Sequence, residues 1–203
     1  MSQSTTAPVT LEVVYPENLG RLHLLLKLFL GWLYVGIPHG IILYVYGILA
    51  WITTFIAFIA ILITGRYPLV LFNFSVGYQR WSARVNAYWV YFMVDSYPPF
   101  SNDAPDHPLA LEIEYPETLS RGKAVLKVLL GWLYAGIPRG IALAIYFIAV
   151  LVVLFISWWS ILIFGKFPQG FFDFVVGFVR WGTRLNAYLY LLRDEYPPFN
   201  GRA

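Results

Sequence analysis

Two long stretches without a charged residue constrain the fold of this chain more than any other feature. They cover residues 40–64 and 140–164. A helix of about 25 residues is roughly 37 Å long, which exceeds the roughly 30 Å hydrocarbon core of a bilayer. Charged residues make up only 12% of the 203 residues, whereas a soluble domain usually has about 25%. The sequence therefore predicts an all-α integral membrane protein.

The two apolar stretches belong to two tandem copies of one unit. Residues 11–100 align with residues 111–199, and about half of the aligned positions are identical. The paired landmarks are LEVVYPE and LEIEYPE, GWLYVGIPHG and GWLYAGIPRG, FNFSVGYQRWSARVNAY and FDFVVGFVRWGTRLNAY, and DSYPPF and DEYPPF. Residues 101–110, rich in Pro and Asp, predict a linker. Residues 1–10 and 200–203 remain as short tails.

Each unit predicts the same order of elements. An alternating stretch at residues 11–15 indicates a short extended segment at the membrane surface. Helices over residues 17–36 and 40–64 would follow, separated by the Gly-Ile-Pro-X-Gly sequence, because proline lacks the amide hydrogen that a continuing helix needs. The two helices would form a transmembrane hairpin. The equivalent ranges in the second unit are 111–115, 117–136 and 140–164.

The third element, residues 68–94 or 168–193, predicts an amphipathic helix. Polar and small residues share one of its faces at helical spacing: in the first unit Asn73, Gly77, Arg80 and Arg84. Helices with a basic face commonly lie in the membrane interface, and a third, tilted crossing is the alternative. The paired prolines of Tyr-Pro-Pro-Phe then predict an extended exit from each unit.

The basic residues predict the topology. They occupy mostly the same positions in both units, so the positive-inside rule orients both units in the same way. We therefore expect four transmembrane helices, both termini in the cytoplasm, and a pseudo-twofold axis along the membrane normal. Only His39 and Arg139 would lie at the far turns. A re-entrant hairpin that does not fully cross the membrane fits the same charges.

Six basic residues are candidate contacts for lipid headgroups, because arginine forks onto phosphate oxygens and a lysine inside a span is a functional candidate. The alternatives for the arginines are non-specific anchoring, or pairing with Asp173, Glu17 or Glu117. The alternative for the lysines is that they extend back to the interface. The six candidates are Lys27, Arg80, Arg84, Lys127, Arg180 and Arg184.

Other kinds of chemistry find little support in the sequence. The absence of cysteine excludes disulfides and thiolate ligands. None of His23, His39 and His107 recurs in the other unit, so we expect no metal site. Nucleotide-binding loops and hydrolase motifs are absent, so we expect no enzyme activity and no cofactor. The net charge of +3 fits anionic lipids better than nucleic acid.

The landmarks YPE, GWLY-x-GIP, F-x-F-x-VG-x-x-RW-x-x-R-x-NAY and D-x-YPPF resemble the DUF4389 family of uncharacterised bacterial membrane proteins. The resemblance covers nearly all of both units. It implies a multi-pass protein of the bacterial cytoplasmic membrane, and it supplies no activity, substrate or catalytic residue.

The sequence favours a non-enzymatic membrane scaffold or accessory subunit. Such a protein would pack apolar helices against lipids and against partner membrane proteins or a second copy of itself. The alternative is binding or transport of a lipid or small molecule at the interface of the two repeats, since tandem repeats are common in transporters.

Overall fold

The computed structural model describes residues 8–198 and residue 201, so the predicted tails lie largely outside the described residues. The first unit contains β1 (Val9–Val13), α1 (Arg21–Phe29), the π-helical turn η1 (Trp32–Gly36), α2 (Ile37–Thr64), α3 (Leu69–Val85) and the π-helical turn η2 (Asn86–Val90). The second unit contains β2 (Leu109–Ile113), α4 (Arg121–Gly131), η3 (Trp132–Gly136), α5 (Ile137–Phe164) and α6 (Gln169–Leu189).

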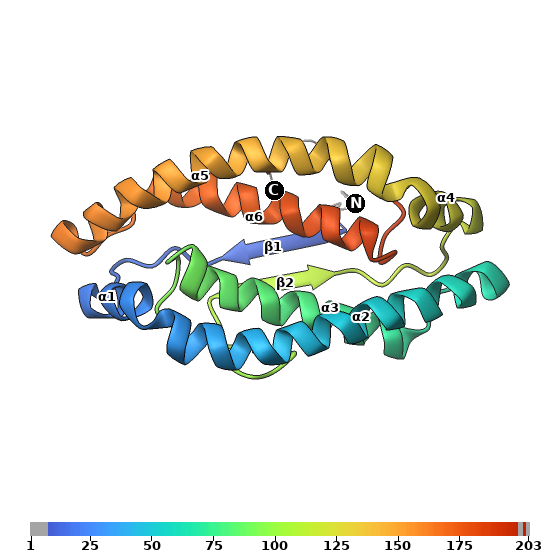
Figure 1. Cartoon of the computed structure of the whole chain (residues 1–203), viewed down its shortest axis with the longest axis horizontal. Coiled ribbons are helices and arrows are strands. Elements are labelled where there is room, and N and C mark those ends of the chain that lie inside the picture. Colours follow the sequence, from blue (N-terminus) through green and yellow to red (C-terminus); the bar gives the residue numbers. More distant parts are fainter. Residues whose placement is uncertain (1–7, 199–200, 202–203) are drawn as a thin grey trace, which may run out of the picture.

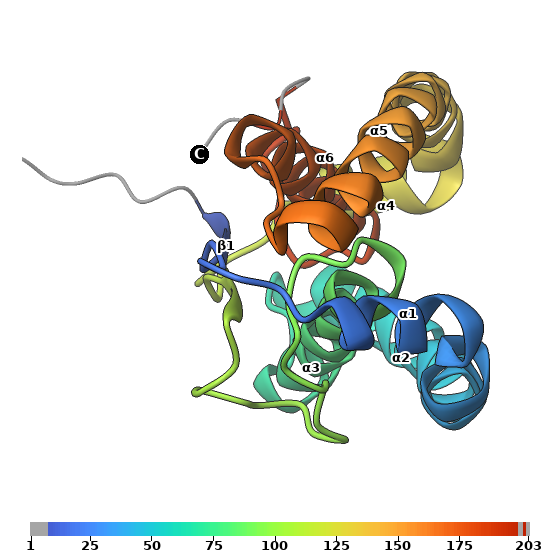
Figure 2. The ribbon, with the colours of Figure 1, turned by 90° about the vertical axis from the view of Figure 1, so that its left-hand side faces the viewer.

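The elements form three layers, as Figure 2 shows. A ribbon of β1 and β2 lies on one side, α3 and α6 lie in the middle, and α2 and α5 lie with α1 and α4 on the other side. The two strands pair antiparallel, with Leu11 opposite Leu111, and both leucines are buried. Strands lie where the extended segments were predicted at the start of each unit, but each begins and ends two residues earlier than predicted. Their pairing with each other did not follow from the sequence pattern.

The predicted break at Gly-Ile-Pro-X-Gly is wrong. η1 leads directly into α2, and Arg121–Phe164 forms one continuous helix. Pro38 lies in the first turn of α2, where a missing amide hydrogen costs little. The carbonyl of Tyr34, four residues before Pro38, instead accepts a hydrogen bond of 3.1 Å from the hydroxyl of Tyr97. Each unit therefore contains one long helix where the sequence predicted a two-helix hairpin.

The chain reverses at Gly65 and Gly165, after the long helices. Both glycines adopt the left-handed conformation, with φ of 73° and 71°, which L-residues with a side chain rarely adopt. α3 then runs back along α2, and α6 runs back along α5 (Figure 1). The middle layer of the molecule follows from these two reversals.

The two units exchange their N-terminal segments. β1 and α1 of the first unit pack on α6 and α5 of the second, while β2 and α4 pack on α3 and α2. The amide of Leu19 donates to the carbonyl of Gly165, and that of Leu119 donates to the carbonyl of Gly65, each at 2.8 Å. A half-turn about the viewing direction of Figure 1 interchanges the two units. The chain is thus pseudo-twofold symmetric, with the same contact made in both directions.

Two helices in the described part of the chain are long and apolar enough to cross a membrane, namely Trp32–Thr64 and Arg121–Phe164. They run antiparallel (Figure 1). This agrees with the predicted membrane character of the chain, whereas the four crossings expected from two hairpins are not present as separate helices.

The reversal at Gly165 predicts the effect of a substitution there. Gly165→Ala should destabilise the protein by about 1–2 kcal/mol, because alanine is strained in the left-handed conformation. Gly140→Ala is the matched control, since Gly140 lies within α5 with open space around it, and alanine favours a helix by up to about 1 kcal/mol. Thermal unfolding in mild detergent, followed by tryptophan fluorescence, measures both. A lower midpoint for the control than for Gly165→Ala would contradict the assignment.

Candidate functional site

A buried lysine forms the most distinctive polar centre of the first unit. The side chain of Lys27 on α1 is 1% exposed. Its Nζ donates to Oδ1 of Asp95 at 2.6 Å and to the carbonyl of Val94 at 2.7 Å. The ammonium also lies 4.3 Å from the centre of the Tyr88 ring, where a cation–π interaction is favourable. A carboxylate, a carbonyl and an aromatic ring therefore compensate this buried charge.

The partner carboxylate also fixes the start of the first helix. Oδ2 of Asp95 accepts a hydrogen bond of 2.6 Å from the amide of Gly20, which precedes α1. A negative charge is favourable at this end of a helix dipole. Burial lowers the pKa of the Lys27 ammonium below its ordinary value, and the hydrogen bond and charge of Asp95 offset part of that effect.

The second unit builds the same centre. Nζ of Lys127 donates to Oδ1 of Asp194 and to the carbonyl of Arg193, each at 2.7 Å, and lies 4.4 Å from the centre of the Tyr188 ring. Oδ2 of Asp194 accepts from the amide of Ser120 at 2.6 Å. We call these two arrangements the Lys–Asp clamps. They join the first helix of each unit to the segment that follows its third helix.

The predicted arginines contact the ribbon. Nε of Arg80 donates to the carbonyl of Leu111 at 2.8 Å, and its guanidinium pairs with Asp103 and Glu112, each at 2.6 Å. Arg180 mirrors this contact through Nε and NH2, which donate to the carbonyl of Leu11 at 3.1 Å and 2.9 Å. Each arginine thus holds the strand that opens the other unit.

Four of the six candidate headgroup contacts are buried, namely Lys27, Arg84, Lys127 and Arg184. Arg84 donates to the carbonyls of Ser101 and Asn102 in the linker. Arg80 and Arg180 are partly exposed on the ribbon side of the middle layer. The contact of these six residues with lipid stays a prediction, while their contacts within the chain are structural.

His39 lies in a buried cluster, and the predicted far-side turn at this position is absent. The Nε1–H of Trp81 donates to Nδ1 of His39 at 3.0 Å, the Tyr97 hydroxyl lies 3.0 Å from Nε2, and the Phe100 ring stacks at 4.0 Å. A proton donated to Nδ1 leaves Nε2 to carry the hydrogen of a neutral imidazole. The cluster packs the end of the first unit onto its long helix.

Arg139 replaces His39 in the second unit and is fully buried. Its guanidinium carbon lies 3.7 Å from the centre of the Tyr196 ring, and it donates to the carbonyl of Pro197. Both residues at this position contact the Tyr-Pro-Pro-Phe segment of their own unit. His39 does so by ring stacking and a hydrogen bond, and Arg139 by a cation–π contact and a hydrogen bond. Within residues 8–198 and 201, no group of three or more histidine, aspartate or glutamate side chains gathers where it could bind a metal ion.

The aspartates of the two clamps were not predicted from the sequence. Asp95 and Asp194 stand about 67 residues after their lysines, so no local pattern links the pairs. The signal that was available is recurrence: both the lysine and the D-x-YPPF aspartate appear in each unit.

Removing one partner of a clamp should lower the free energy of unfolding. Asp95→Asn should lower stability by about 3 kcal/mol, because it leaves the Lys27 ammonium buried without its counter-charge. The double variant Lys27→Met, Asp95→Asn should recover part of that loss. Asp173→Asn, at an exposed position of α6, is the control and should change stability by less than about 0.5 kcal/mol. Thermal unfolding in detergent measures all three, and equal midpoints for Asp95→Asn and the control would rule out a stabilising clamp.

Comparison with known proteins identifies the family. No curated protein and no solved structure matches the chain. The model of one family, described as "Domain of unknown function (DUF4389)", matches twice, over residues 26–102 and 126–200. Both matches run from the first helix through the Lys–Asp clamp to the end of the unit. The chain therefore belongs to the DUF4389 family and carries two tandem copies of its domain.

Proposed function

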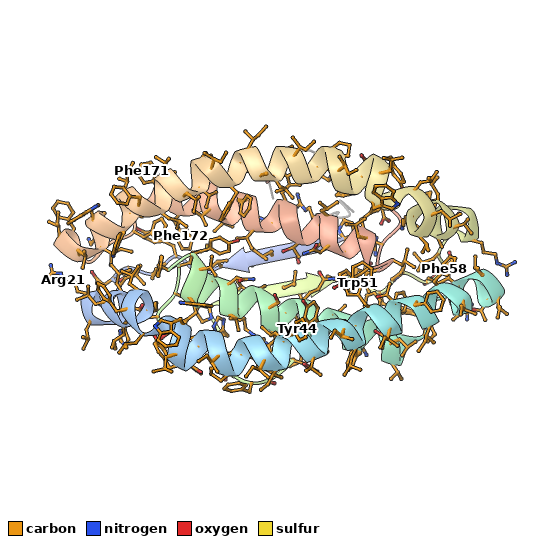
Figure 3. All side chains as sticks on the ribbon, viewed as in Figure 1. Arg21, Tyr44, Trp51, Phe58, Phe171 and Phe172 are labelled. Atoms are coloured by element: carbon orange, nitrogen blue, oxygen red, sulfur yellow. The ribbon has the colours of Figure 1, made fainter. Side chains whose placement is uncertain are left out.

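We propose that this protein is a non-catalytic membrane scaffold that lies within one leaflet, with its long helices parallel to the membrane plane. One observation carries the proposal: most exposed large apolar side chains among the described residues belong to α1, α2, α4, α5 and the turns η1 and η3. We call this surface the apolar face. Figure 3 shows side chains along the whole length of the long helices, with Tyr44 and Trp51 on α2.

The apolar face is too long for a perpendicular crossing. Between residues 24 and 64 the only basic or acidic side chains are Lys27 and His39, and both are buried. In residues 124–164 they are Lys127 and Arg139, which are also buried. The continuous helices in these stretches, Trp32–Thr64 and Arg121–Phe164, have 33 and 44 residues, which is about 50 Å and 66 Å of helix, whereas the hydrocarbon core is about 30 Å thick. A perpendicular orientation would leave about half of this surface in water, and an orientation parallel to the membrane covers all of it.

The basic residues at the helix ends support the same placement. Arg21 donates to the carbonyl of Ile163 at the end of α5, and Arg121 donates to that of Ile63 at the end of α2. Each end of the elongated molecule therefore carries basic residues from both units. If the long axis crossed the membrane, the positive-inside rule would favour neither end. In the parallel placement all these residues lie at one depth and the pseudo-twofold axis follows the membrane normal.

The ribbon side is the polar counterpart of the apolar face. Asp103, Glu112 and Glu114 are 77%, 69% and 72% exposed in their side chains. Charged side chains are costly in hydrocarbon, so this side faces water, which we place in the cytoplasm of a bacterial cell. A molecule with one apolar and one charged face is suited to join membrane partners to the membrane surface.

Labelling of introduced cysteines tests the placement, because the chain contains none of its own. In sealed vesicles of defined orientation, Asn18→Cys and Arg66→Cys should react with a membrane-impermeant maleimide from the same side. Gly40→Cys, at an exposed position with open space around it, should react from neither side. Labelling of residues 18 and 66 from opposite sides would show a crossing, and labelling of residue 40 from the far side would show a hairpin.

The scaffold role itself predicts association. Native mass spectrometry of the protein extracted in mild detergent should detect a second copy or a partner membrane protein, because the apolar face offers unbroken surface for helix packing. A protein that stays strictly monomeric and without partners under these conditions would argue against a scaffold and leave lipid binding as the better proposal.

A further inference from the structure

A groove of about 270 Å³ lies between α3 and α6, where the two units meet. Its lining comes from these two helices, from Asn86 and Tyr91 after α3, and from Leu143 of α5, and in the described part of the chain it includes no residue of the ribbon. One lining residue, Leu143, belongs to the layer of the long helices. Figure 1 looks onto this region, where α2 and α5 bow apart in front of α3 and α6.

The lining is polar without being charged. Amides come from three lining residues and hydroxyls from two: the amides are those of Gln79, Asn86 and Asn186, and the hydroxyls those of Tyr91 and Thr183. The other described lining residues are aliphatic, glycine or aromatic, and none carries a charge. A groove of this composition suits a neutral ligand that forms hydrogen bonds.

Gln79 lacks the partners that a buried amide needs. Its side chain is 6% exposed, and neither Nε2 nor Oε1 has a hydrogen-bond partner among the described residues. Buried polar groups in folded proteins nearly always form hydrogen bonds, because a group without a partner has lost its hydrogen bonds to water and gained none within the protein. The equivalent residue in the other unit is Val179, which lines the same groove. The pseudo-symmetry therefore breaks at this position, where one unit has an amide and the other an aliphatic side chain.

We propose that this groove binds the headgroup of a neutral glycerolipid that carries a free hydroxyl and ester carbonyls, such as a diacylglycerol. The hydroxyl would donate to Oε1 of Gln79, and an ester carbonyl would accept from its Nε2. A quinone offers acceptors only and would leave Oε1 unpaired. An anionic phospholipid would bring a charge against a lining that has no cation to pair with it.

The placement of the groove suits such a lipid. Because Leu143 of α5 lines the groove, acyl chains would extend past the long helices into the hydrocarbon. This route rests on the proposed placement within one leaflet. Recognition of the headgroup rests only on the residues of the groove.

The test uses the full chain in mild detergent, with binding of 1,2-dioctanoylglycerol measured by native mass spectrometry. The wild type should bind one molecule saturably. Gln79→Val, which copies the residue of the other unit, should weaken binding by about tenfold or more, through the loss of two hydrogen bonds. Asn186→Leu, at an exposed position that is safe for folding, should also weaken binding. Asn73→Leu, exposed on α3 outside the groove, is the matched control and should bind as the wild type does.

Two further measurements separate binding from structure. Gln79→Val should keep or raise the thermal midpoint of the lipid-free protein, since it removes an unpaired buried amide, whereas a structural role would lower the midpoint. Trioctanoylglycerol, which lacks the hydroxyl, and dioctanoylphosphatidylglycerol, which is anionic, should bind more weakly than the diacylglycerol. Equal binding of either lipid, or undiminished binding by Gln79→Val, would overturn the proposal. Because no bilayer is present, this outcome is independent of the cysteine labelling.

Discussion

The reciprocal hydrogen bonds between the two units hold the rest of the architecture in place. Each long helix ends at a left-handed glycine, and the carbonyls of Gly65 and Gly165 accept the amides of Leu119 and Leu19 from the opposite unit. This bond fixes where α1 and α4 begin, and it sends each N-terminal strand across the third helix of the other copy. The arginines of α3 and α6 then hold those strands. The ribbon therefore exists only because the two copies are joined in one structure.

The Lys–Asp clamps explain how each unit accommodates a buried lysine beside the apolar face. Removal of an ammonium from water is costly unless a counter-charge and hydrogen bonds replace the lost hydration. Asp95 and Asp194 each supply both, and each also accepts the amide at the start of a helix. The D-x-YPPF segments thereby become part of the fold. Their tyrosines in turn lie against the carbonyls that Pro38 and Pro138 leave without an amide partner.

The pseudo-symmetry separates structural residues from candidates for function. Positions that serve the exchange are the same in both units: the helix-ending glycines, the clamps and the arginines on the ribbon. Gln79 and Val179 differ, and they lie together in the groove where the units meet. His39 and Arg139 also differ, but each is occupied with the Tyr-Pro-Pro-Phe segment of its own unit. The central groove is thus one place, among the described residues, where a departure from symmetry leaves a buried polar group without a hydrogen-bond partner.

Local composition, and recurrence at a spacing of about 100 residues, were enough to predict the two tandem units, their apolar helical stretches, the extended segments before them and the family. The continuation of the helices through Pro38 and Pro138 could not be predicted in this way, since the hydroxyls that bond to the carbonyls of Tyr34 and Tyr134 come from Tyr97 and Tyr196, far along the chain. The tertiary structure also chose the partners of the buried lysines and exchanged the strands between units. Contacts between distant segments satisfy these backbone and charged groups, and no local pattern records them.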